Sequence, residues 1–301
     1  MYTTAGVWTV SPTAEHHAGM RIAGNLDHTP ISGETATTIF EWFLSQGYEA
    51  RNFNLAELSG VDHCGGVLHI KNGAAAFCDV DQMWSTFESL PMDSQYLDTR
   101  TGKVKNKHKR SNVNAGEEAE EANINEGIGT TVAFSSTPEL KKVIQGLKQF
   151  GPDFQTLLAE GNYYHTPTKC GIGFHGDTER RWAMGVTMGK SRIIEFQAFV
   201  RSFPEGPPIR LTLDHGDIYL MYENGCGWDW KRTPKIGELP SGCPRRQYHA
   251  PHFRHRAGDE GFLRANDKEN ERKWNKRRAK ATKKRSHPDA PEASPSKRLK
   301  K

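Results

Sequence analysis

Long apolar runs and paired cysteines are both missing from this sequence of 301 residues. No segment approaches the roughly 20 consecutive apolar residues that a membrane-spanning helix requires, so an integral membrane protein of that kind is excluded. The opening residues, MYTTAGVWTV, lack a basic region followed by an apolar one, and we therefore expect no secretory signal. The five cysteines are scattered without a C-x-x-C pair, which favours reduced thiols in an intracellular protein over a disulfide framework or a cysteine zinc site.

Excess charge is small overall, at +5, but its distribution is uneven. The segment Lys268–Lys301 holds 14 Lys and Arg residues against four acidic ones, a net charge of +10, which leaves −5 for Met1–Asp267. A nucleic-acid coat protein that spreads positive charge over its whole fold is therefore excluded. The segment 268–301 has little to bury, so we predict a disordered basic tail.

The apolar pattern predicts helices before a β-rich core. Residues 1–30 show no periodicity and are predicted to form an irregular lead-in, whereas apolar residues in 34–46 and in 138–147 recur at helical spacing. From Cys170 to Tyr222 the pattern changes to short β-type runs separated by turns. We therefore expect an α+β protein with a mainly β core, either a β-sandwich or a double-sheet jelly roll, supported by N-terminal helices.

The spacing H-x-D suits a metal site, because a non-haem Fe(II) oxygenase needs two imidazoles and one carboxylate on one face of the metal. Residues i and i+2 at the end of a strand project to the same side and can supply two of these ligands. Three such pairs occur in the sequence: His175 with Asp177, His215 with Asp217, and His287 with Asp289.

The context of each pair favours His175 and Asp177. His287 lies in the predicted disordered tail, and His215 lies in a segment that is typical of a turn before a buried strand. His175 follows the apolar run GIGF and precedes a charged loop. The third ligand then has three candidates: His249, His252 and His255.

A resemblance to a known family is carried by three segments: NYYHTPTKCGIGFHGDTERR, LDHGDIYLM and FRHRAG. Their combination is similar to the AlkB-like branch of the 2-oxoglutarate- and Fe(II)-dependent dioxygenases, especially the group found in large DNA viruses and diverse microbes. The resemblance covers about Lys103 to Arg264. It implies a cupin-like jelly roll, the double-stranded β-helix, in a domain of residues 31–267 with its catalytic core at about 160–267.

The resemblance also implies a ligand set and a cosubstrate site. The family motif H-x-D-x-E supplies His175 and Asp177 as iron ligands, and its R-H-x-A-G element supplies His255. Its N-x-Y motif implies that Asn162 and Tyr164 donate to 2-oxoglutarate. A buried arginine pairs with the far carboxylate of 2-oxoglutarate, and the position nine residues after His255 implies Arg264, with Arg272 as the weaker alternative.

Substrate contacts follow from the same comparison. Glu179 corresponds to an acidic residue that lies against the target base in the family. The segment VKNKHKRSN is similar to the family's basic lid strand, which implies that Lys107, Lys109 and Arg110 contact phosphate without reading sequence. A base must leave its stack to reach the iron, and an aromatic ring near the mouth can stack on it. The candidates for that ring are Trp182, Trp228 and Trp230.

The resemblance therefore implies a dioxygenase that uses Fe(II), 2-oxoglutarate and O2 to demethylate or hydroxylate a nucleic-acid base, releasing succinate and CO2. A protein or small-molecule hydroxylase on the same scaffold and a non-catalytic nucleic-acid-binding module remain the alternatives. We expect a monomer that binds DNA or RNA and no membrane. The terminal cluster PSKRLKK also predicts nuclear localisation in a eukaryotic or virus-infected cell.

Overall fold

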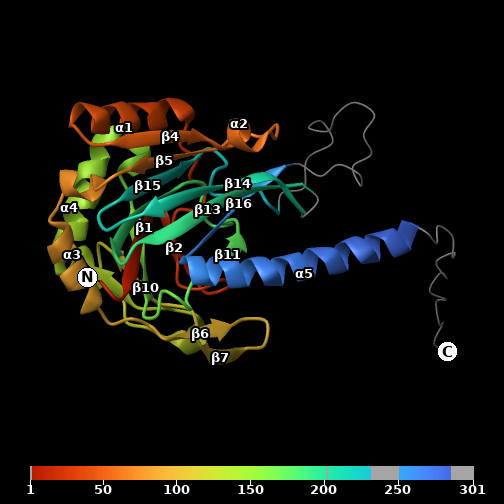
Figure 1. Cartoon of the computed structure of the whole chain (residues 1–301). Helices are drawn as coiled ribbons and strands as arrows, with labels where there is room; N and C mark the ends of the chain where they lie inside the picture. Colours follow the sequence, from red (N-terminus) through yellow and green to blue (C-terminus); the bar gives the residue numbers. More distant parts are fainter. Residues whose placement is uncertain (1, 201–202, 232–250, 286–301) are drawn as a thin grey trace, which may run out of the picture. The chain divides into compact units, whose positions relative to one another are not determined.

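The computed structural model describes residues 2–200, 203–231 and 251–285 (Figure 1). The chain divides into two compact units, residues 1–263 and residues 264–301. The first unit consists mostly of β-strands with few helices, which confirms the prediction of a β-rich core with supporting helices.

A large sheet of eight strands forms the centre of the first unit, in the order β4-β5-β15-β12-β1-β10-β8-β9. The strands in this order are β4 (Ala50–Asn54), β5 (Gly66–Ile70), β15 (Ile218–Tyr222), β12 (Ala183–Gly189), β1 (Ala5–Ser11), β10 (Leu158–Tyr164), β8 (Ser111–Gly116) and β9 (Thr131–Ala133). All neighbouring strands are antiparallel except β8 and β9.

A smaller sheet of four strands has the order β11-β16-β13-β14. Its strands are β11 (Ile172–His175), β16 (His252–Gly258), β13 (Arg192–Val200) and β14 (Phe203–Leu213). Two hairpins complete the strands that are described in the first unit: β2 (Thr13–Glu15) with β3 (Ile22–Gly24), and β6 (Gln95–Asp98) with β7 (Lys103–Asn106).

Helices cover one face of the large sheet and the small sheet covers the other (Figure 1). The helices on the first face are α1 (Gly33–Ser45), α3 (Val80–Glu88) and α4 (Pro138–Leu147), whereas the short helix α2 (Leu55–Ser59) packs against β13 and β14 of the small sheet. The 3-10 turns are Gly73–Ala76, Ile124–Glu126, Phe134–Ser136, Lys148–Phe150 and Pro152–Phe154. Alternation along β15 explains the two layers: Ile218 and Leu220 pack among the helices, whereas Tyr219 and Met221 face the small sheet. The two helices predicted from apolar spacing are α1 and α4.

The prediction of an irregular lead-in is wrong for Ala5–Ser11. This segment forms β1, which pairs with β10 on one side and β12 on the other, at the centre of the large sheet. Its side chains are buried on both faces, as for Trp8, which is 1% exposed. A short strand that is covered on both faces carries no clear alternation, so periodicity alone could not identify it.

The prediction of a disordered tail is wrong for residues 268–285. These residues belong to α5 (Glu260–Arg285), and only 286–301 lie outside the described part of the chain. The segment is rich in Ala, Glu, Lys and Arg, which are strong helix formers, and Glu269 pairs with Lys273 at 2.6 Å. Local helix propensity does not depend on burial, so a segment with little to bury can still form a helix.

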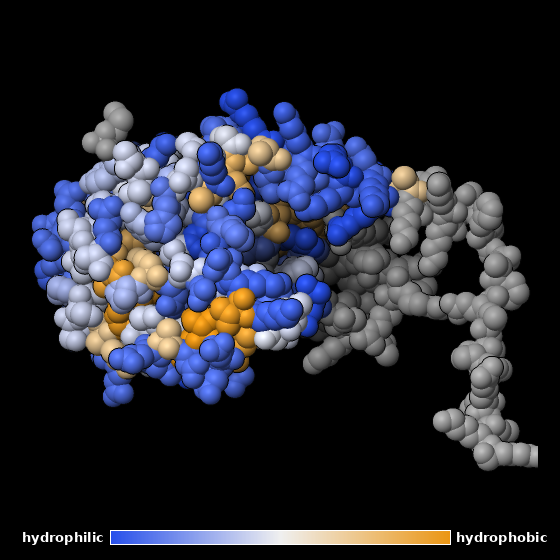
Figure 2. Space-filling view, turned by 90° about the horizontal axis from the view of Figure 1, so that it is seen from below, coloured by the Kyte–Doolittle hydropathy of each residue, from blue (hydrophilic) through white to orange (hydrophobic). Residues whose placement is uncertain are grey.

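No helix in the described ranges is long and apolar enough to cross a membrane. Cys64, Cys78, Cys170 and Cys226 are free thiols. Cys243 lies outside the described residues. Figure 2 shows a mostly hydrophilic face, on which apolar residues appear in small groups.

Replacing Trp8 tests whether β1 is part of the core. Its ring packs edge-on against Phe87 at 5.0 Å between centroids. Trp8→Ala is expected to lower the free energy of unfolding by about 3–5 kcal/mol, because it leaves a large cavity in the packed interior. Chemical denaturation gives this value, and Leu44→Ala, at an exposed leucine of α1, is the control with a change of about 0.5 kcal/mol or less. A loss for Trp8→Ala no larger than the control would contradict a central position for β1.

Candidate functional site

A cavity of about 290 Å³ lies between the two sheets of the first unit. Strands β1, β10, β12 and β15 line it from the large sheet, and β11, β13, β14 and β16 line it from the small one. The loop that follows β11 adds the segment 176–180. Most of the residues that the sequence predicts for the site line this one cavity.

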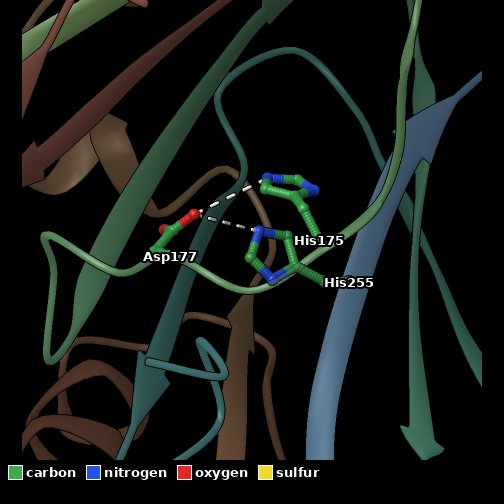
Figure 3. Close-up of side chains that lie close together, drawn as sticks. All are labelled: His175, Asp177 and His255. Atoms are coloured by element: carbon green, nitrogen blue, oxygen red, sulfur yellow. Dashed lines mark ion pairs between the residues drawn. The ribbon is translucent and has the colours of Figure 1, made fainter. Parts of the chain in front are cut away.

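Three predicted ligands come together at the wall of the cavity, where β11 pairs with β16 (Figure 3). His175 and His255 are directly opposite each other in the antiparallel register of these strands. Asp177 Oδ1 lies 3.6 Å from His175 Nε2 and 3.9 Å from His255 Nε2. The pairing of two strands therefore brings together residues that are far apart in the sequence.

Both histidines offer a nitrogen lone pair. His175 Nδ1 donates to the carbonyl oxygen of Gly173 at 2.8 Å, which leaves Nε2 free to bind a cation. Burial lowers the pKa of His255 well below its usual value, and the charges of His175 and Arg180 act in the same direction. A neutral imidazole is the form that binds metal.

These donor atoms fit a divalent transition metal. One ligand atom from each of the three residues lies within 4.8 Å of the other two, and the set is two imidazoles with one carboxylate. This arrangement leaves further coordination positions open for substrate or cosubstrate. Asp177 is held in place by its backbone N–H, which donates to the carbonyl oxygen of Cys226 at 3.0 Å.

The alternatives for the third ligand are narrowed by the structure. His252 is two residues from His255 on β16, yet its ring stacks on Phe199 and its Nε2 accepts from Arg254 at 3.1 Å. It does not line the cavity. His249 lies outside the described residues, as does His287.

Asn162 and Tyr164, the predicted cosubstrate contacts, both line the cavity, because alternate residues of β10 face it. The Asn162 side-chain oxygen accepts from Asn112 Nδ2 at 2.6 Å. Tyr163 points to the other face of the sheet and packs near Trp84 and Phe87.

A buried arginine that the sequence analysis missed also lines the cavity. Arg192, the first residue of β13, is 4% exposed, and its guanidinium lies 3.6 Å from the centre of the Tyr164 ring. Among the described residues, neither Nη1 nor Nη2 has a hydrogen-bond partner, and burial lowers the pKa of the group. A buried guanidinium with two unused donor nitrogens is suited to bind a carboxylate.

The prediction of Arg264 as this buried arginine is wrong. Arg264 is exposed in α5, at the first position of the second unit. Arg264 was predicted only from its position nine residues after His255. Here β16 ends at Gly258 and a helix begins at Glu260, so the same holds for Arg272, which is exposed on that helix.

Glu179 lines the cavity, but it is already paired. Arg180 Nη1 donates to Glu179 at 2.9 Å, and Arg180 Nη2 bonds to Glu160. All three side chains are at most 8% exposed, and Arg180 Nη1 also lies 3.8 Å from Asp177 Oδ2. Arg180 therefore neutralises several carboxylates next to the candidate metal ligands, and it is a second residue that the sequence analysis missed.

The predicted phosphate contacts are not all at the cavity. Arg110 lines it and lies 4.0 Å from Glu160, whereas Lys109 is exposed with its ammonium 5.7 Å from the Phe262 ring. Lys107 is largely buried, which lowers its pKa to about 8, and its Nζ has no hydrogen-bond partner in the part of the chain described.

Of the three candidate tryptophans, only Trp230 lines the cavity. Trp182 is fully buried and packs against Phe154, so it is a core residue. Trp228 lies under the guanidinium of Arg181. The second H-x-D pair is a structural turn, since Asp217 binds His69 at 2.8 Å and the backbone N–H of Asn72 at 2.8 Å.

A comparison with known protein families finds no match. The chain is 32% identical over 230 residues to an uncharacterised protein of Acanthamoeba polyphaga mimivirus, and the match covers 74% of this chain and 89% of the viral protein. The chain belongs to the family of this mimivirus protein. Membership of the mimivirus family names no activity, so the function has to be argued from the site.

One further carboxyl group, Glu15, lines the cavity and was not predicted. Burial raises its pKa to about 7, and the carboxylates of Glu179 and Glu160 add to the increase. The folded protein therefore binds more protons than the unfolded chain between about pH 4.5 and pH 7. The free energy of unfolding falls as the pH rises through this window.

Glu15→Gln removes the carboxyl group whose ionisation in the cavity destabilises the folded protein. We expect the stability of the variant relative to the wild type to increase from pH 5 to pH 8 by on the order of 1 kcal/mol, a value reduced for partial solvent exposure. Urea denaturation at each pH measures it. Glu57→Gln removes one charge from an exposed position on α2, and an equal change in that variant would assign the effect to overall charge instead.

Proposed function

We propose that this protein is a 2-oxoglutarate- and Fe(II)-dependent dioxygenase that oxidises a nucleic-acid base. The observation that carries the proposal is the cluster of His175, Asp177 and His255 in a cavity that also contains the unpartnered guanidinium of Arg192. The first group is suited to an iron ion, and the second to the far carboxylate of a dicarboxylic acid.

The order of the strands supports a double-stranded β-helix. In an eight-stranded jelly roll, strands 1, 8, 3 and 6 form one sheet, and strands 2, 7, 4 and 5 form the other. Counting β10 to β16 as strands 1 to 7 gives 2-7-4-5 for the small sheet and 6-3-β1-1 for the matching part of the large one. The N-terminal strand β1 then takes the position of strand 8.

Because β1 takes the position of strand 8, the proposed site uses Arg192 instead of Arg264. When no strand follows the distal histidine, a basic group from that part of the chain is lost from the cavity. Arg192 on β13 supplies one from the neighbouring strand of the small sheet. It therefore replaces Arg264 in the proposed cosubstrate site.

Each residue has a separate task in this proposal. His175, Asp177 and His255 hold the iron, Arg192 binds the far carboxylate, and Asn162 and Tyr164 lie along the cosubstrate. Iron and 2-oxoglutarate supply, with O2, the oxidant for a C–H bond. Arg180 Nη1 places a positive charge 3.8 Å from Asp177 Oδ2, and apolar side chains such as Val7 and Leu213 limit the entry of water.

The part of the cavity beyond the metal ligands favours a flat polar substrate. Trp230 offers a ring for stacking, Glu15 and Glu179 offer oxygen atoms, and Arg110 offers hydrogen-bond donors. These are the groups that a flipped base would meet. A protein or small-molecule hydroxylase on the same scaffold is the alternative. A monomeric state and nuclear localisation stay predictions, and the PSKRLKK cluster lies outside the described residues.

Replacing His175 tests the iron site. Anaerobic addition of Fe(II) and 2-oxoglutarate to the wild type is expected to give the weak visible charge-transfer band of the iron complex, and His175→Ala is expected to lose it. His215→Ala, in the structural H-x-D pair, is the matched control and keeps the band. The absence of a band in the wild type, or an unchanged band in His175→Ala, would contradict the proposal.

The substrate class is tested with the same proteins. Succinate release and the masses of the resulting nucleosides are followed with methylated DNA and RNA oligonucleotides, and His175→Ala serves as the inactive reference. Release of succinate with a peptide or metabolite but with neither nucleic acid would support the alternative hydroxylase.

The two arginines can be compared directly. Arg192→Met is expected to weaken the binding of 2-oxoglutarate roughly tenfold to a hundredfold, because a charge-assisted pair contributes about 1.5–3 kcal/mol. Anaerobic calorimetry on the Mn(II)-loaded protein measures the affinity, and Arg192→Lys should recover part of it. Arg264→Met should bind 2-oxoglutarate like the wild type, and the reverse result for the two variants would restore the original assignment.

A further inference from the structure

The C-terminal part of α5 has an unusually dense positive charge. Of the 14 residues in Arg272–Arg285, nine are Lys or Arg and none is acidic. The acidic residues of the helix all precede this segment, the last being Glu271. A helix rises 1.5 Å per residue, so the segment is about 21 Å long and has about one positive charge per 2.3 Å.

This basic segment has no apolar face. Its described side chains from Arg272 to Ala279 are exposed, apart from the partly buried Trp274. A helix that lies on a membrane needs a continuous apolar side to insert, and a helix that packs on a protein core needs an apolar stripe. The basic segment has neither an apolar side nor an apolar stripe, so it is suited to bind a charged partner in water.

The positions of the charges are unfavourable for the helix alone. Lys273 and Arg277 are four residues apart and therefore neighbours on one face, as are Arg272 and Lys276. Like charges at this spacing destabilise a helix by a few tenths of a kcal/mol per pair. A partner of high negative charge density removes this repulsion, so binding and helix stability are coupled.

We propose that the basic segment Arg272–Arg285 binds the phosphate backbone of double-stranded nucleic acid. Duplex DNA has one negative charge per about 1.7 Å of its axis, close to the charge spacing of the segment, and its major groove admits an α-helix. Contacts to phosphate position the protein without selecting a sequence. No described residue of this segment lines the cavity, so the inference does not depend on the iron site.

The salt dependence of duplex binding by the full-length protein tests the proposal. A fluorescent 20-base-pair duplex is titrated at a series of salt concentrations, with fluorescence anisotropy as the readout. The triple variant Lys276→Gln, Arg277→Gln, Arg278→Gln removes three cations and keeps good helix formers, which circular dichroism checks. We expect weaker binding and a logarithmic salt slope smaller by about 2.7, since each lost phosphate contact contributes about 0.9.

A matched control removes three exposed cations from the first unit, in the variant Arg51→Gln, Arg100→Gln, Lys169→Gln. It should bind the duplex with the slope of the wild type. An unchanged slope in the α5 variant, or an equal decrease in the control, would overturn the proposal. Displacement of the duplex by polyglutamate at the same concentration of negative charge would also overturn it, by favouring an acidic protein as the partner.

Discussion

The pairing of β11 with β16 is the constraint on which the rest of the site depends. It places His175 opposite His255, and the turn after β11 brings Asp177 to the same point. A slip of one residue in this register would turn one imidazole away from the cavity, because successive side chains of a strand face opposite sides. Strand β13 pairs with the other edge of β16, so the same small sheet also positions Arg192.

Charge is distributed unequally within the cavity. Near the candidate metal ligands, Arg180 is surrounded by Glu160, Glu179 and Asp177, which lie within 4 Å of its terminal nitrogens Nη1 and Nη2. At Arg192 the guanidinium has only the face of the Tyr164 ring as a close partner among the described residues. Removing a charged group from water without a partner is costly, and a bound carboxylate would offset this cost. This contrast explains why we assign the anionic cosubstrate to one end of the cavity and the substrate to the other.

The sequence predicted features that depend on local spacing, and it failed where distant strands decide the outcome. The pair His175 and Asp177 and the helices α1 and α4 are encoded within a few residues, whereas Asn162 and Tyr164 came only from the resemblance. The central position of β1 depends on pairing with strands about 150 residues away. The choice of Arg264 used only its spacing from His255, and that spacing does not reveal that the chain forms α5 after β16.

The central claim is that one ion and one dicarboxylate share the cavity between the sheets. Anaerobic crystals grown with Mn(II) and 2-oxoglutarate, measured for anomalous scattering, test it most directly. We predict an anomalous peak bounded by His175, Asp177 and His255, with the dicarboxylate extending from the metal to the guanidinium of Arg192. A metal bound elsewhere, or a dicarboxylate that does not reach Arg192, would contradict this account of the site.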